Sequence, residues 1–310
     1  PGRRPVTGSA VTATLLIMRS PVKVRLAWQP DMARHLIRFG VPLIGAGALN
    51  QLILNTDYVI VNRYLGTAVA GAYFLAFNIS NWPMTLISFS MRRTAVAGFA
   101  RLQGDPAAIQ RAFVGAATLL ISATLPMALL IGLLAPEVLT VAYGPKWAIG
   151  ATALRFLAGI SVVRLFYSLC IELLAALGHT TGIFLVQVAW WLALIAGMWW
   201  GAVHHGLVGV GVAQFAAALG VAMPVLFWLL HSHQVRPSQL LPRLARPLLG
   251  GMALAVVVFA VRAAFDASVA RLLIGGAAGV AAYAVVVLPG TPALASARRL
   301  ARARRPVAHS

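Results

Sequence analysis

The stretch NQLILNTDYVIVNRYLGTAVAGAYFLAFNISNW, residues 50–82, contains parts of two apolar segments that both carry polar side chains. With about 100° between successive helical residues, Gln51, Asn55, Tyr58 and Asn62 share one face of the first segment. A second stripe of this kind follows on the next segment: Asn78, Asn81, Thr85, Ser88 and Arg92. Unpaired amides are costly in hydrocarbon. We therefore predict that both stripes line an internal cavity through which a polar compound passes.

The composition indicates a polytopic membrane protein. Sixty per cent of the 310 residues are hydrophobic and 10% are charged, whereas about a quarter of the residues of soluble domains are charged. The mean hydropathy is +0.86. The net charge of +19 comes from basic residues between the hydrophobic runs, a pattern that sets membrane orientation and does not indicate nucleic-acid binding. The single Cys170 offers no metal cluster, so we predict no metal and no cofactor.

The hydropathy pattern predicts an all-α bundle of about eight transmembrane helices. Each predicted span is about 20 residues or longer, as a bilayer requires. The predicted spans are 39–62, 68–91, 112–134, 148–177, 181–203, 206–231, 247–264 and 268–288.

Charge asymmetry gives the predicted topology. Residues 1–38, 92–111, 232–246 and 289–310 hold nineteen of the twenty-five Lys and Arg residues, and the intervening loops with the helix ends beside them hold four. Both termini are therefore predicted to be cytoplasmic. The tryptophans near His204 are predicted to anchor their helix at the outer interface. The basic tail 289–310 is predicted to attract anionic membrane lipids.

Four parts are predicted along the chain. Because the chain opens with Pro1 and its first apolar run is short, residues 1–38 are interpreted as the end of an upstream helix followed by a basic cytoplasmic connector. We expect the chain to be a fragment. Residues 39–231 would form a six-helix lobe, and 232–288 a cytoplasmic loop with two trailing helices. The basic tail 289–310 is the fourth part.

Charged residues inside the predicted spans are candidate functional residues, because burying a charge in a bilayer is costly. Asp57 is interpreted either as a coupling site or as half of a structural pair with Arg63 or with a neighbouring helix. Arg164 shares a helical face with Glu172. It is predicted either to pair with Glu172 or Asp57, or to bind an anionic substrate such as a phosphate.

Several short motifs resemble those of a known family. They are FGVPL at 39–43, LNTDYVIVNRYLG at 54–66, AGAYFLAFNISNWP at 70–83, GFARLQGD at 98–105 and YGPKW at 143–147. Together they resemble the second half of the bacterial oligosaccharide and polysaccharide flippases. That family belongs to the superfamily that also contains the multidrug MATE exporters and the lipid II flippases.

The resemblance implies the second lobe of a two-lobed, MATE-like flippase in the bacterial inner membrane. The implied substrate is an isoprenoid-pyrophosphate-linked oligosaccharide or polysaccharide unit, of the kind used for lipopolysaccharide or exopolysaccharide. Sugar hydroxyls would be bound by the two stripes and pyrophosphate by Arg. The implied partners are a missing N-terminal lobe and a glycan polymerase or glycosyltransferase. Without that lobe, we expect the chain alone not to transport. The candidate substrate-binding residues are Gln51, Asn55, Asn62, Asn78, Asn81, Arg92 and Arg164.

Three other functions remain open at this point. A MATE-type exporter of small molecules, coupled to H⁺ or Na⁺, would depend on Asp57. A membrane glycosyltransferase or polymerase would need a catalytic acidic pair facing water and an extended loop, which the sequence does not offer, so we predict that the protein is not an enzyme. A non-transporting scaffold is the third alternative. Transport driven by ATP bound to this chain is excluded by the short loops and by the lack of a GxxxxGK[ST] sequence.

Overall fold

The computed structural model describes residues 30–85, 98–102, 104–232 and 235–288. The chain divides into two units, Pro1–Val41 and Pro42–Ser310. The first is described only by the start of helix α2 (Pro30–Leu65), which begins nine residues before the predicted span. The fold below is that of the second unit. The expectations for residues 1–29, for Ser88 and Arg92, and for the basic tail lie outside the described residues.

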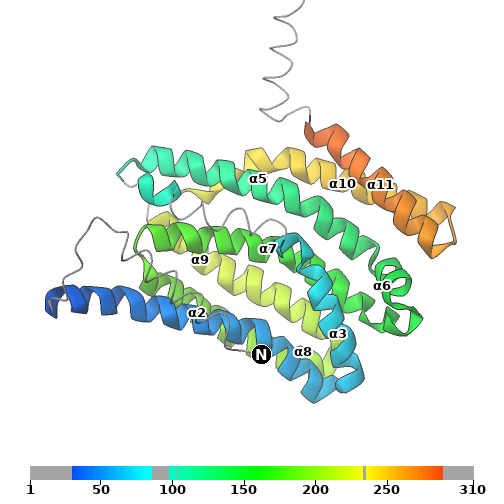
Figure 1. Ribbon diagram of the computed structural model, residues 1–310, viewed down its shortest axis with the longest axis horizontal. Coiled ribbons are helices and arrows are strands. Elements are labelled where there is room, and N and C mark those ends of the chain that lie inside the picture. Colours follow the sequence, from blue (N-terminus) through cyan, green and yellow to red (C-terminus); the bar gives the residue numbers. More distant parts are fainter. Residues whose placement is uncertain (1–29, 86–97, 103, 233–234, 289–310) are drawn as a thin grey trace, which may run out of the picture. The chain divides into compact units, whose positions relative to one another are not determined.

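Every regular element of the described residues is helical (Figure 1). After α2 the chain forms α3 (Thr67–Ser80), α5 (Pro106–Leu133), α6 (Ala135–Tyr143) and the 3₁₀ turn η1 (Pro145–Gly150). It continues with α7 (Ala151–Ala176), α8 (Thr180–Ala217), the π-helical turn η2 (Ala218–Ala222) and α9 (Met223–Ser232). The 3₁₀ turn η3 (Pro237–Leu240) leads into α10 (Leu241–Ala264) and α11 (Ser268–Val287).

Within the described residues, six helical segments are long and apolar enough to cross a membrane. They are Pro30–Leu65, Pro106–Leu133, Pro145–Ala176, Thr180–Ser232, Pro237–Ala264 and Ser268–Val287. The segment Thr180–Ser232 contains two of the eight predicted spans, 181–203 and 206–231. The predicted span 68–91 is described only to residue 85, so its full length is not tested. The all-α polytopic bundle predicted from hydropathy is confirmed.

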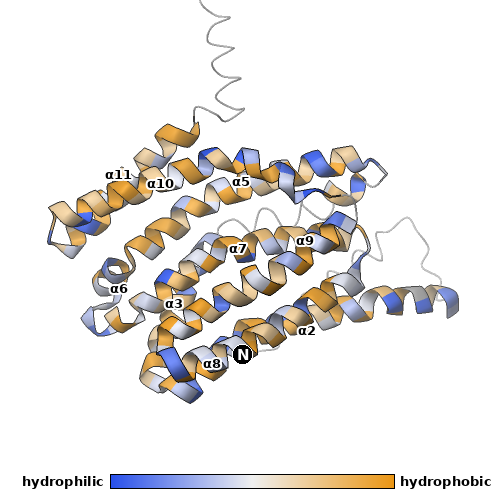
Figure 2. Cartoon of the chain, turned by 180° about the vertical axis from the view of Figure 1, so that it is seen from behind, coloured by the Kyte–Doolittle hydropathy of each residue, from blue (hydrophilic) through white to orange (hydrophobic). Residues whose placement is uncertain are grey.

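The surface is as expected for a protein surrounded by lipid. Most positions along the helices are hydrophobic, and hydrophilic positions gather at helix ends and turns (Figure 2). Large apolar side chains are exposed in the middle of spans, including Leu119 on α5, Val256 on α10 and Leu273 on α11. In water such a surface would be unfavourable, but in a bilayer these side chains contact lipid tails.

Helix α7 lies at the centre of the lobe, packed against α3, α5 and α8. Its buried residues, among them Leu154, Leu157, Ile160 and Leu173, occur on every side of the helix. Lipid tails are as apolar as leucine, so burial in a bilayer gives little hydrophobic gain, and close packing must stabilise the bundle. A helix buried all round is the natural place for charged residues that lipid would not tolerate.

A tight reversal at Gly206 separates the two halves of α8. Gly206 has φ 58° and ψ −140°, which interrupts the helix. A Cβ atom on Gly209 would collide with the Gly201 carbonyl, and a Cβ on Gly197 would lie 3.3 Å from the Ala213 Cβ. In both pairs, 201 with 209 and 197 with 213, the two residues are equally far from residue 205 along the chain. The two halves of α8 therefore run antiparallel and in contact. Glycine at 201 and 209 permits this close approach.

The α10–α11 hairpin packs beside α5 (Figure 1). Leu254 and Val258 of α10 and Tyr283 of α11 form a small core with Leu134. The Tyr283 hydroxyl donates a hydrogen bond of 2.7 Å to the Ser122 carbonyl of α5. This hairpin therefore contributes a second core, next to the main one around α7.

Candidate functional site

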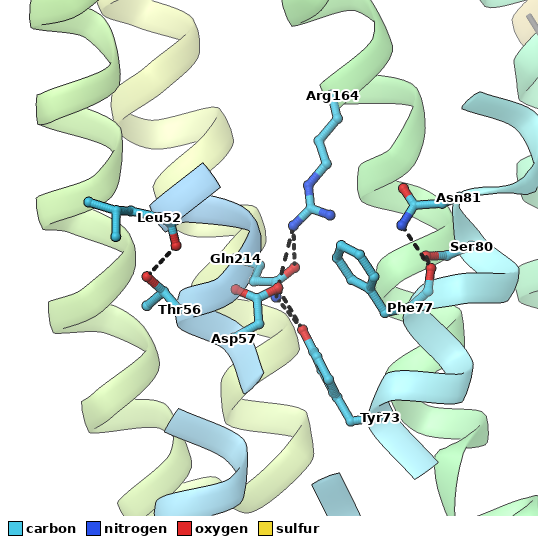
Figure 3. Close-up of polar contacts among 9 residues, drawn as sticks. All are labelled: Leu52, Thr56, Asp57, Tyr73, Phe77, Ser80, Asn81, Arg164 and Gln214. Carbon is cyan, nitrogen blue, oxygen red and sulfur yellow. Dashed lines mark hydrogen bonds and ion pairs between the residues drawn. The ribbon is translucent and has the colours of Figure 1, made fainter. Parts of the chain in front are cut away.

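Four helices contribute one residue each to a buried polar cluster (Figure 3). Asp57 comes from α2, Tyr73 from α3, Arg164 from α7 and Gln214 from the second half of α8. Their exposed fractions are 0%, 2%, 8% and 1%. We name these four residues the Asp57 cluster.

The carboxylate of Asp57 is the centre of this cluster. Its Oδ2 accepts hydrogen bonds from the Tyr73 hydroxyl at 2.9 Å and from Gln214 Nε2 at 2.7 Å. Arg164 Nη2 lies 3.6 Å from the same oxygen and donates to Gln214 Oε1 at 3.4 Å. The guanidinium also lies over the Phe77 ring, 5.4 Å from its centroid. A buried carboxylate is tolerated when a cation and hydrogen bonds compensate it in this way.

The cluster contains one of the pairings left open by the sequence. Asp57 pairs with Arg164, from a neighbouring helix, at 3.6 Å. Arg63 is exposed at the end of α2, and Glu172 lies half-buried two turns further along α7 than Arg164. Asp57 and Arg164 are 107 positions apart, so their pairing depends on how α2 and α7 pack. Tyr73 and Gln214 were not among the predicted site residues.

A cavity of about 590 Å³ opens beside the Asp57 cluster. Its walls come from α2, α3, α7, the first half of α8 and residues 81–85. Three predicted substrate-binding residues, Gln51, Asn81 and Arg164, line it. The remaining lining is mainly apolar and aromatic, a combination typical of ligand-binding cavities. The lining residues are Leu43, Ala46, Gly47, Asn50, Gln51, Ile53, Leu54, Phe77, Asn81, Met84, Thr85, Arg164, Tyr167, Ser168, Ile171, Ile183, Gln187 and Trp190.

Four polar groups in the cavity wall have no hydrogen-bond partner among the described residues. They are Arg164 Nε, the Tyr167 hydroxyl, Gln187 Oε1 and Trp190 Nε1. All four residues are less than 9% exposed. The Tyr167 and Trp190 rings meet edge to face, with centroids 4.6 Å apart. Because buried polar groups are normally paired, we call this set the polar tetrad and treat it as a candidate ligand-binding surface.

Three asparagines of the predicted stripes lie away from the cavity. Asn55 Nδ2 donates to the Gln51 carbonyl at 2.7 Å, and Asn78 Nδ2 donates to the Phe74 carbonyl at 2.8 Å. Both side chains are exposed, as is Asn62. Asn81 Nδ2 makes the same kind of bond, to the Phe77 carbonyl at 2.9 Å, and yet Asn81 lines the cavity. A shared helical face did not place all members of a stripe in one cavity, and Arg92 lies outside the described residues.

The polar tetrad had a weak signal in the sequence. Gln187 is an isolated amide in an otherwise apolar segment, and Gln214 is another such amide in the following one. Each could have been selected by the rule that identified Asp57 and Arg164. Tyr167 and Trp190 could not, because aromatic residues are frequent in membrane helices. The spacing of Arg164 to Tyr167 and of Gln187 to Trp190 is i, i+3, which places each pair on one helical face.

A second buried charge cluster lies beside α6, just after the end of α5. Glu137 of α6 is 2% exposed, and its Oε1 lies 3.3 Å from Arg262 Nε and 3.8 Å from Arg271 Nη1. Arg262 Nη1 also donates to the Leu133 carbonyl at 2.7 Å. These contacts tie the α10–α11 hairpin to α6. Within the described part of the chain, no group of three or more His, Cys, Asp or Glu residues could hold a metal ion.

Comparison with known proteins agrees with the motif resemblance. The profile of a family described as "Polysaccharide biosynthesis protein" matches residues 4–151. The teichuronic acid biosynthesis protein TuaB of Bacillus subtilis is 24% identical over 86% of this chain, and the match covers 58% of TuaB. The succinoglycan biosynthesis transport protein ExoT of Rhizobium meliloti is 25% identical over 87% of this chain and 56% of its own length.

The chain is therefore similar to proteins of polysaccharide biosynthesis and export over most of its length, and to the family profile over residues 4–151. A solved structure of the lipid II flippase MurJ, in an inward closed conformation, has the same fold, with a TM-score of 0.68 at 15% identity. The superposition covers 89% of this chain and 59% of MurJ. The amylovoran biosynthesis protein AmsL of Erwinia amylovora is 31% identical over 109 residues, 35% of this chain and 28% of AmsL.

The comparisons bear on two of the sequence-based predictions. ExoT is named as a transport protein and MurJ as a flippase, which agrees with the choice of a transporter over a glycosyltransferase or polymerase. The chain spans between half and two thirds of the length of TuaB, ExoT and MurJ.

Proposed function

We propose that this chain is a lobe of a flippase for lipid-linked glycans. It would help to move an isoprenoid-pyrophosphate-linked oligosaccharide or polysaccharide unit from the cytoplasmic to the outer leaflet. The observation that carries this proposal is the cavity with its polar tetrad, because it presents buried polar groups that have no partner among the described residues, inside a membrane protein. The similarity to TuaB, named for teichuronic acid biosynthesis, and to ExoT, named for succinoglycan biosynthesis transport, supports it.

The chemistry of the tetrad fits a glycan with a charged head. Arg164 Nε, the Tyr167 hydroxyl and Trp190 Nε1 are donors, and Gln187 Oε1 is an acceptor. Sugar hydroxyls both donate and accept, and the oxygens of a pyrophosphate or an acidic sugar accept from a guanidinium. A cavity of about 590 Å³ is within the usual range for binding sites of small ligands. The isoprenoid chain can stay in the bilayer beside the cavity.

Transport would require a second wall. The superposition covers 59% of MurJ, so we infer that the opposite side of the cavity is provided by protein beyond the matched part. Alternating access would rock the two walls about the central site. We therefore expect this chain alone to bind the glycan lipid without moving it across a bilayer. Glycosyltransferases and polymerases that make and extend the glycan are the expected partners.

The membrane and orientation belong to the same proposal. The excess of Lys and Arg in alternate loops predicts cytoplasmic termini. The proposed location is the inner membrane of a bacterium, where lipid-linked glycans are assembled. With this orientation the cavity lies on the cytoplasmic half of α2, α3, α7 and α8, because its lining residues come from those parts of the helices.

The geometry favours this function over ion-coupled drug export. An ion-coupling site needs a carboxylate that exchanges H⁺ or Na⁺ with water, whereas Asp57 is fully buried. Its Oδ2 accepts two hydrogen bonds and lies 3.6 Å from Arg164, and its Oδ1 has no partner among the described residues. We therefore assign Asp57 a structural role, holding Arg164 in the cavity wall.

The test is binding of a lipid-pyrophosphate-linked oligosaccharide to the purified chain in nanodiscs. Arg164→Gln is compared with Arg155→Gln, which changes an exposed arginine on the same helix. Loss of a charge-assisted hydrogen bond predicts an affinity about 10- to 100-fold lower for Arg164→Gln. The Arg155→Gln variant should bind like the unmodified chain. Equal binding by both variants would refute the proposed site.

A second variant separates binding from folding, because Arg164→Gln also removes the partner of Asp57. Tyr167→Phe deletes a hydroxyl that has no partner among the described residues, so the fold loses no hydrogen bond. We expect unchanged thermal stability and about fivefold weaker glycan binding. The exposed Tyr64→Phe is the matched control. Unchanged binding by Tyr167→Phe would remove this hydroxyl from the site.

A further inference from the structure

Two cavities outside the glycan site meet at the end of the bundle where α5 begins and α9 ends. One has about 640 Å³ and is mainly polar, with Gln110, Arg111 and Gln239 in its wall. The other has about 830 Å³ and is mainly apolar. His231 and Arg236 line both. A polar chamber joined to an apolar groove matches the shape of an amphiphile.

The groove has the apolar lining that an acyl chain requires. Its apolar wall includes Phe166, Phe227, Trp228, Leu240, Leu241 and Leu244. Phe166 forms the buried floor at 7% exposure, with its ring 6.1 Å from that of Phe227, whereas Trp228 and Leu241 are about 70% exposed at the rim. The groove is thus open to the surrounding lipid and closed toward the core.

A specific clamp holds Arg236 at the junction. Gln110 Nε2 donates to the Arg236 carbonyl at 2.9 Å, and the Arg236 amide donates to Gln110 Oε1 at 2.9 Å. This reciprocal pair joins α5 to the segment before η3, 126 positions later in the chain. The two hydrogen bonds from the Gln110 side chain fix the backbone of Arg236. Arg236 is thereby held where the two cavities meet.

The charge at the junction is positive. Arg111 lies 4.0 Å from Asp105, which compensates part of its charge. No ion pair joins Arg236 to a carboxylate within the described residues, and its side chain is exposed, as is that of His231. A cation at the mouth of an apolar groove attracts an anionic headgroup whose chain enters the groove.

We propose that this junction is a binding site for an anionic glycerophospholipid. The headgroup phosphate lies in the polar chamber against Arg236 and Arg111, and one acyl chain lies along the groove. The lipid fills the space between α5, α9 and the start of α10, so it links the α10–α11 hairpin to the main lobe. This site is separate from the glycan cavity and does not depend on the proposed transport function.

The probe is phosphatidylglycerol, with phosphatidylcholine as the zwitterionic comparison, and binding is measured by native mass spectrometry of the purified chain. We expect more bound phosphatidylglycerol than phosphatidylcholine. Arg236→Gln should reduce the bound phosphatidylglycerol about fivefold, as expected for one basic residue near a lipid headgroup. Arg243→Gln is the matched control, because Arg243 is exposed on the first turn of α10 and lines neither cavity.

Two further comparison ligands identify which part of the lipid is bound. Phosphatidylglycerol with two eight-carbon chains should bind more weakly than the long-chain lipid, and soluble glycerol phosphate should not compete with the long-chain lipid. Equal binding of both lipid classes, or equal losses from Arg236→Gln and Arg243→Gln, would overturn the proposal. So would full competition by glycerol phosphate, or displacement by an isoprenyl phosphate alone, because each would assign the site to another ligand.

Discussion

Asp57 and Arg164 depend on each other for burial. Removing one partner of a buried ion pair leaves an uncompensated charge and typically costs about 3–5 kcal/mol. We expect Asp57→Asn and Arg164→Gln each to lower the thermal stability of the purified chain. The double variant should be clearly less destabilised than the sum of the two, since no buried charge remains. Arg63→Gln, at an exposed position, should have little effect. Additive losses in the double variant would show that the two residues do not act as a pair.

The same pair shows how far single residues can be predicted from sequence. A charge inside an apolar segment is visible without a structure, so the sequence alone identifies Asp57 and Arg164 as residues whose burial needs an explanation. Their partner atoms on Tyr73 and Gln214 were not visible, because partner choice depends on the rotation of four packed helices. Similarly, Asn78 and Asn81 share a stripe in the sequence, yet only Asn81 lines the cavity.

At the scale of helices, the antiparallel contact inside α8 depends on glycine. A Cβ on Gly209 would meet the backbone of Gly201, so Gly209→Ala must push the two halves apart. We expect a loss of about 1–3 kcal/mol, the usual cost of overpacking. Gly276→Ala on α11 is the control, since nothing lies within 4 Å of the added Cβ, and it should be neutral or slightly stabilising. Thermal unfolding in detergent measures both. Equal stability of the two variants would contradict the close packing.

The helices were largely predictable, because a bilayer imposes both their length and their apolar composition. The reversal at Gly206 coincides with the start of the predicted span 206–231. Hydropathy does not predict how the helices pack against one another. The tie from Glu137 to Arg262 and Arg271 joins elements more than 120 positions apart, and only the fold brings them together.

For the whole molecule, the proposed orientation is tested by labelling single cysteines. Cys170 is buried, so it can remain as an unreactive background. His204→Cys, beside the reversal in α8, should react with an impermeant maleimide in intact cells. Gln239→Cys, in η3, should react only after the cytoplasmic membrane has been permeabilised. The opposite pattern would invert the proposed topology and place the glycan cavity on the outer half of the membrane.

The central claim is that the cavity, and no other face of these helices, contacts the lipid-linked glycan. It is tested most directly by site-specific photo-crosslinking in cells that make the glycan. A photoreactive residue in place of Asn81 lies in the cavity wall, whereas one in place of Asn78, about one turn away on the same segment, lies on an exposed face. We predict a glycan-containing adduct from position 81 and none from position 78. An adduct from position 78 alone, or equal adducts from both, would contradict the account.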